Sequence, residues 1–69
     1  MTDHVYKQIE ITGSSQVGIE DAVSVAIAKA SASVRNMHWF QVTETRGFID
    51  ADQIKYWQVT VKVGFRLED

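Results

Sequence analysis

Three side chains suited to binding fall on the polar face of two predicted strands: Trp39, Tyr56 and Gln58. An indole exposed to water leaves a large apolar ring without contacts, so we expect Trp39 to pack against another subunit or to stack on a flat ligand. This argument alone favours subunit packing. The amide of Gln58 donates and accepts hydrogen bonds, which suits the imide edge of a pyrimidine-like ring, but an amide here can also simply face water.

The sequence offers few groups for covalent or metal-assisted catalysis. It contains no Cys, and we expect His4 and His38 to be exposed, with no Ser–base pairing evident for either. Without Cys there is no disulfide, no thiolate-bound zinc and no iron–sulfur cluster. The acidic residues are dispersed or occur in pairs such as Glu20-Asp21, which does not match a calcium loop. We therefore predict that the protein is not an enzyme and has no metal site.

Arginine side chains are the candidates for phosphate binding. Arg46 lies near the end of a predicted strand and Arg66 near the C-terminus, and a guanidinium holds phosphate through paired hydrogen bonds. Salt bridges between subunits are an equally good use for both, and Glu44 is a candidate partner. The segment 13–18 joins a strand to a helix, but Glu20 and its acidic neighbour would repel phosphate, which favours a plain turn.

Length and charge restrict the class of protein. The 69 residues with a net charge of -2 allow one domain, residues 1–69, and argue against a nucleic-acid partner. A chain this short removes only about 60% of its unfolded surface from water, and without disulfides oligomerisation is the expected support. No apolar run approaches the ~18 residues of a membrane span, and no targeting segment is evident. We therefore predict a cytoplasmic protein without a membrane partner.

Hydrophobic periodicity predicts an α+β fold of the order β-α-β-β. Alternation over Val5–Thr12 predicts a strand, and apolar residues at three- and four-residue steps from Ile19 to Met37 predict an amphipathic helix that stops near Asn36. Either of two serines before the helix, Ser14 or Ser15, is expected to cap it. The Ala-rich stripe of the helix favours a three-stranded antiparallel sheet wrapped around one helix.

The last two strands are expected at 39–48 and 55–67, joined by a hairpin turn at 50–53. A turn centred on residues 51 and 52 pairs Phe40 with Val63 on the side of the helix, and it pairs Val42 with Val61 in the same way. The same register pairs Gln58 with Thr45, about 20 Å along the strand from Trp39. One chain cannot bring Trp39 and Gln58 to one small ligand, so a shared site would combine different subunits.

Four segments in succession resemble the dodecin family over nearly the whole chain. They are VYKQIEITGSS, GIEDAVSVAIAKAS, NMHWFQVTETRGFI and WQVTVKVGFRLED. The resemblance implies a β-α-β-β subunit that assembles as a hollow homododecamer and binds flavins in pairs on symmetry axes. It also implies that Trp39 is the stacking tryptophan, that Gln58 bonds the pyrimidine edge, and that the excited flavin is quenched by the stacked indole.

The resemblance further implies a ligand. Arg46 and Arg66 match arginines of the bacterial branch, which more often binds flavin mononucleotide (FMN) than riboflavin or lumichrome, so both are expected to contact phosphate. Coenzyme A is a candidate second ligand. Two residues depart from the family pattern: His38 replaces a common acid, and Trp57 replaces a more usual Tyr or Phe and is expected to alter packing only.

The function that this resemblance implies is flavin binding, storage and sequestration with photoprotective quenching. One alternative is a structural or interaction oligomer in which Trp39 only packs a subunit interface. A flavoenzyme is the third interpretation, for which the chain offers no nicotinamide site or catalytic base.

Overall fold

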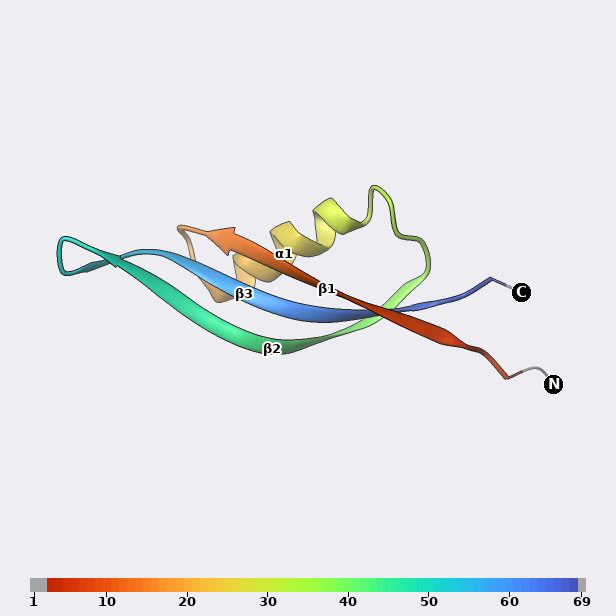
Figure 1. Cartoon of the computed structure of the whole chain (residues 1–69). Coiled ribbons are helices and arrows are strands. Elements are labelled where there is room, and N and C mark those ends of the chain that lie inside the picture. The colour runs from red at the N-terminus through yellow and green to blue at the C-terminus, as the bar shows by residue number, and fades with distance from the viewer. Residues whose placement is uncertain (1–2, 69) are drawn as a thin grey trace.

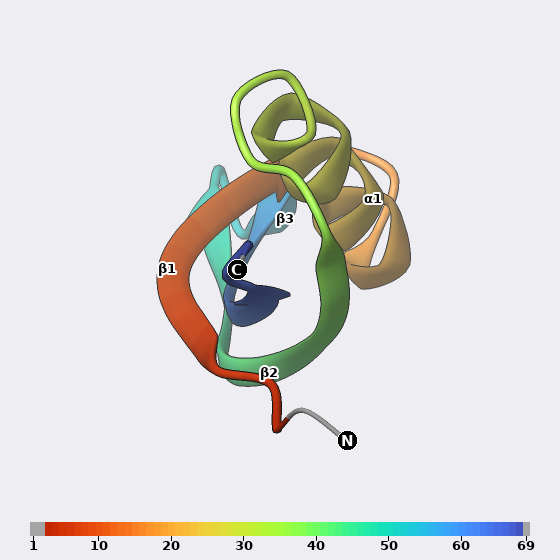
Figure 2. The same cartoon turned by 90° about the vertical axis from the view of Figure 1, so that its right-hand side faces the viewer.

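The computed structural model describes residues 3–68, and it confirms the order β-α-β-β (Figure 1). Strand β1 (Tyr6–Ser15) leads into helix α1 (Ile19–Ala30), and strands β2 (Met37–Asp50) and β3 (Gln53–Arg66) form a long hairpin. The three strands make one antiparallel sheet in the order β1-β3-β2. Figure 2 shows the curved sheet from its end, with α1 lying along one side of it. No helix in residues 3–68 is long and apolar enough to cross a membrane.

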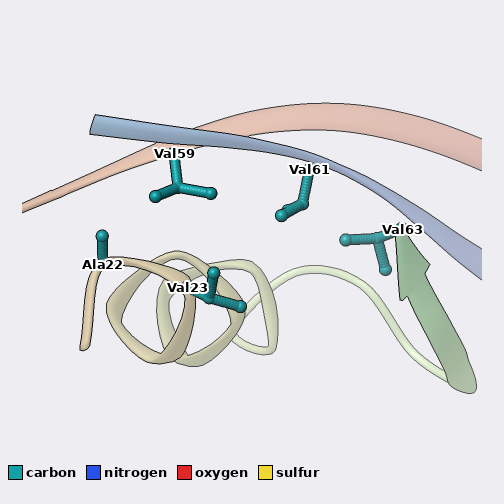
Figure 3. Close-up of a cluster of buried hydrophobic side chains, with 5 residues drawn as sticks. All are labelled: Ala22, Val23, Val59, Val61 and Val63. Atoms are coloured by element: carbon teal, nitrogen blue, oxygen red, sulfur yellow. The ribbon is translucent and has the colours of Figure 1, made fainter. Parts of the chain in front are cut away.

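The core lies between α1 and the middle strand. Val59, Val61 and Val63 alternate along β3 on the side of the helix, and each is at most 1% exposed. Because successive side chains of a strand point to opposite faces, this row places the residues between them on the other face of the sheet. Ala22 and Val23 of α1 point toward the three valines (Figure 3).

Small residues bring α1 close to β1, as the Ala-rich stripe predicts. Ala22 and Ala26 are buried, and Gly13 of β1 lies directly beneath them. A β-carbon at Gly13 would stand 2.9 Å from that of Ala26 and closer still to the carbonyl oxygen of Ala22. The close packing of α1 on β1 therefore requires a residue without a side chain at position 13.

The helix is shorter than the periodicity predicts, since it ends at Ala30 and not near Asn36. Ser31 donates a hydrogen bond from its hydroxyl to the carbonyl oxygen of Ala28 at 2.6 Å. Such local bonds from serine compete with continued helix formation. Asn36, with a left-handed φ of 62°, stands immediately before β2, where the chain reverses.

The prediction that Ser14 or Ser15 caps the helix is wrong. The residue that caps α1 is Gly18, which makes no side-chain cap bond. The hydroxyl of Ser15 instead accepts the amide N–H groups of Val17 and Gly18 at 2.9 and 3.3 Å and donates to the Asp21 carboxylate at 2.7 Å. Ser15 thus shapes the turn that leads into the helix.

The hairpin turn forms at the predicted place. Ala51 and Asp52 have φ values of 51° and 64°, as a two-residue turn with both central residues left-handed requires. The predicted pairs Val42–Val61 and Phe40–Val63 are confirmed. The predicted pair of Thr45 with Gln58 is wrong. The register shifts by one residue between Phe48 and Ile49, which sets Arg46 opposite Gln58, and it shifts back between Val42 and Glu44.

The helix covers only part of the sheet. It packs on β1 and β3, so Phe40 and Val42 of β2 face the helix side but stay about half exposed. Together with Ile19, Val23 and Ile27 of α1 they line an open apolar groove of about 860 Å³. The hairpin of β2 and β3 also extends well past α1 (Figure 1), which leaves both faces of its tip open.

Candidate functional site

All four candidate site residues lie on the face of the sheet that is turned away from α1. On β3 this face carries Gln58, Gly64 and Arg66, because they alternate with the buried valines. On β2 it carries Trp39, opposite Gly64, and Arg46, opposite Gln58. We call this surface the open face.

Two bulges in β2 determine which of its side chains lie on the open face. Val42 and Arg46 have the same parity, so a regular strand would turn both toward the helix. The bulge at Thr43 reverses the alternation, and Glu44 and Arg46 then pair with Thr60 and Gln58 of the open face. Regular alternation would place Glu44 and Arg46 on the helix side, and the bulge turns both to the open face.

The second bulge, at His38, allows Met37 to pack against the core while Trp39 turns to the open face. Trp39 is 41% exposed. Its indole lies over Gly64, where a β-carbon would stand closer than 3.0 Å to three atoms of the ring. One side of the indole therefore rests on the β3 backbone. The alternation of β2 predicts that Trp39 lies on the polar face and not under the helix, and the structure confirms this.

One aromatic ring packs against this indole, and a second ring packs against the first. The Tyr6 ring of β1 lies 5.2 Å from the Trp39 ring between centroids, with 56° between the two planes. The imidazole of His38 meets Tyr6 edge to face at 5.4 Å. We call Tyr6, His38, Trp39, Gly64 and Arg66 the tryptophan half-site.

The second group of candidate residues lies toward the hairpin tip. The Gln58 amide nitrogen lies 3.2 Å from the hydroxyl oxygen of Ser14, on the neighbouring strand β1. Opposite Gln58 on the other side, Arg46 forms an ion pair with Glu44, and both side chains are about half exposed. We call Ser14, Glu44, Arg46 and Gln58 the glutamine half-site.

A stacked aromatic pair adjoins the glutamine half-site. Phe48 and Tyr56 face each other across β2 and β3, with centroids 4.6 Å apart and planes 17° from parallel. Tyr56 thus has a nearly parallel stacking partner within the chain, whereas the aromatic neighbour of Trp39, Tyr6, is tilted by 56° against it.

The two half-sites are far apart in one subunit. Gly64, under the indole, and Gln58 are six residues apart on β3, which corresponds to about 20 Å. The structure therefore brings Arg66 near Trp39 and Arg46 near Gln58, but it does not bring Trp39 and Gln58 together. A ligand that touches both needs two subunits.

Sequence analysis did not identify Tyr6, Gly64 and Ser14 as site residues. The signal for them is the pairing of β1 with β3, which sets Tyr6 opposite Arg66 and Ser14 opposite Gln58. The predicted strands gave no register between these two elements. In residues 3–68 no three His, Asp or Glu side chains gather as a metal site would require.

Comparisons with known proteins agree on one family. The family model described as Dodecin matches residues 5–68. The chain is 45% identical to a dodecin of Thermus thermophilus over 65 residues, which are 94% of either chain. It is similar to the solved dodecin of Streptomyces davaonensis, with 43% identity, a TM-score of 0.94 and coverage of 99% of this chain and 100% of that chain.

Solved variants of the Thermus thermophilus dodecin carry replacements at positions that correspond to three candidate site residues of this chain. Three of them are each 42% identical to this chain with a TM-score of 0.92, and each carries one replacement. Two of these variants replace an arginine by alanine, and the third replaces a tryptophan by phenylalanine. They cover 97% of this chain and at least 98% of their own length. The replaced tryptophan and arginines have the same spacing as Trp39, Arg46 and Arg66.

Proposed function

The chain belongs to the dodecin family of small flavin-binding proteins, and we propose that it stores and sequesters flavin by stacking the isoalloxazine ring on Trp39 within a homododecamer. The observation that carries this proposal is the orientation of Trp39. One side of its indole rests on Gly64, and Trp39 remains 41% exposed, which leaves aromatic surface on which a flat ligand can stack.

The glutamine half-site of a neighbouring subunit would supply the polar contacts. The carbonyl oxygen of the Gln58 amide can accept the imide N–H of the pyrimidine ring, while its amide group donates to a ring carbonyl. Ser14 lies beside this amide and helps to hold it in place. Gln58 therefore gives direction to a ligand that the indole binds mainly through its flat surface.

The shape of the subunit supports assembly. Its radius of gyration is 14.6 Å, whereas a compact chain of this length would have roughly 11 Å. Large apolar side chains remain exposed, among them Phe40 and Val42 in the groove and Ile49 and Ile54 at the hairpin tip. Burial of these surfaces between subunits would provide the stability that a small core lacks.

We favour FMN as the flavin because the half-sites carry Arg46 and Arg66. The guanidinium of Arg46 already pairs with Glu44, and at about half exposure this pair is weak enough to yield to a phosphate. Riboflavin would lack that contact. Arg35 lines a separate hollow of about 350 Å³, and its guanidinium makes this hollow the candidate place for the phosphates of coenzyme A as a second ligand.

The proposed mechanism is binding and quenching, without turnover. A stacked indole can donate an electron to the excited flavin, so the complex would protect the cell from flavin photochemistry. Stacking on one aromatic ring contributes about 1–3 kcal/mol, by analogy with bases on aromatic side chains. A site closed between subunits also excludes water from the ring.

Flavin titration tests this function. FMN added to the assembled protein is expected to lose its fluorescence, and Trp39→Ala should weaken its binding by about 5- to 150-fold, the equivalent of one stacking contact. Trp57→Phe is the matched control, because Trp57 lies on the helix side of β3. If the native protein takes up neither FMN nor riboflavin while Trp39→Ala dissociates it, Trp39 is only an interface residue.

A further inference from the structure

The indole of Trp39 lies on an edge strand, where its own strand alone does little to fix its tilt. On the open face it reaches from β2 across β3, above Gly64. Two torsions set the plane of a tryptophan ring, and a flat ligand stacks well only when that plane is fixed before binding. The side chains that touch the ring therefore affect how well it serves as a platform.

Tyr6 is the residue placed to fix this plane. It lies on β1 opposite Arg66, two positions along β3 from Gly64, and its ring is 5.2 Å from the indole. The 56° between the two planes sets Tyr6 against the indole at an angle, so it limits rotation without lying flat over the ring. His38 packs edge to face on Tyr6.

The backbone beneath the indole provides the second constraint. Gly64 is the β3 partner of Trp39, and any side chain there would overlap the indole. The ring is thus confined from below by the β3 backbone and from the β1 side by Tyr6. Three strands contribute to the position of one ring.

We propose that Tyr6 is a positioning residue, which holds the Trp39 indole against Gly64 and presets its plane for a flat ligand. This inference rests on the proposed flavin function for its affinity effect. The preset plane itself is a property of the ligand-free protein, and it can be measured without flavin.

The test uses Tyr6→Leu in the assembled full chain with Trp57→Phe, so that Trp39 is the only indole. Without flavin, Tyr6→Leu should reduce the near-ultraviolet circular dichroism of the indole band and lower the anisotropy of its fluorescence. FMN binding should weaken by about 2- to 13-fold, which is the range of an aromatic pair. Tyr6→Phe should restore both properties, because the ring and not the hydroxyl contacts the indole.

Val5→Ala is the matched control. Val5 precedes Tyr6 and is 64% exposed, so this variant removes an exposed apolar side chain next to Tyr6 in sequence. It should leave both signals unchanged. Gly64→Ala should reproduce the spectral change of Tyr6→Leu by displacing the ring from below, and it provides a second test if Tyr6→Leu does not fold.

The inference is overturned if a folded Tyr6→Leu keeps the indole dichroism of the parent, or if Tyr6→Phe loses it as fully as Tyr6→Leu. A parent protein that binds no FMN refutes the proposed function instead. In that case the dichroism of the ligand-free variants still decides whether Tyr6 positions Trp39.

Discussion

Replacement of Gly13 by alanine tests how closely α1 must approach the sheet. The new methyl group would stand 2.9 Å from the β-carbon of Ala26 and closer to the backbone oxygen of Ala22, whereas ordinary contacts begin at 3.4 Å. Since the helix backbone cannot rotate away as a flexible side chain can, α1 must shift. Overpacking of this kind costs about 1–3 kcal/mol, and a domain of this size has only roughly 3–10 kcal/mol of stability.

Guanidinium unfolding followed by tryptophan fluorescence measures this cost. Gly13→Ala should lower the midpoint and reduce the free energy of unfolding by about 1–3 kcal/mol. Gly18→Ala is the control, because a β-carbon there meets nothing within 4 Å and the extended φ of 166° suits any residue. All samples need equal subunit concentrations, since assembly contributes to apparent stability. Equal losses in Gly13→Ala and Gly18→Ala would refute the close approach of α1 to β1.

Two further predictions concern the ligand. Gln58→Ala should weaken FMN binding by about 5- to 150-fold, equivalent to two lost hydrogen bonds, and leave the oligomer intact by size-exclusion chromatography. Unchanged affinity in a fluorescence titration would exclude Gln58 from the site. Arg46→Ala and Arg66→Ala should each weaken FMN binding more than riboflavin binding, because only FMN carries a phosphate. An equal loss for both ligands would assign the arginine a structural role.

The parts of the fold that follow from local chemistry were predictable from the sequence. The unbroken apolar row of β3 predicted the buried face, and the polar tetrapeptide 50–53 predicted the turn and with it the pairs nearest the core. The end of α1 was not predictable from periodicity, because apolar spacing continues past Ala30 to Val34 and Met37. Hydrogen bonding by Ser31 accompanies the end of the helix in spite of that spacing, and the left-handed Asn36 then leads into β2.

The candidate site was predictable in composition but not in arrangement. The exposed Trp39 and the polar-face Gln58 followed from alternation, and so did their separation. The bulges at His38 and Thr43 did not, because an inserted residue changes the face of every later side chain without a clear sequence signal. Tyr6 could not be assigned for a different reason: its place beside Trp39 depends on a pairing between strands that are distant in sequence.

A crystal structure of the assembled protein grown with FMN tests the central claim most directly. The account predicts an isoalloxazine ring stacked on the open side of the Trp39 indole, with Gln58 of another subunit at its pyrimidine edge. A structure in which the indole is sealed by a neighbouring subunit, with no flavin against it, would contradict the account.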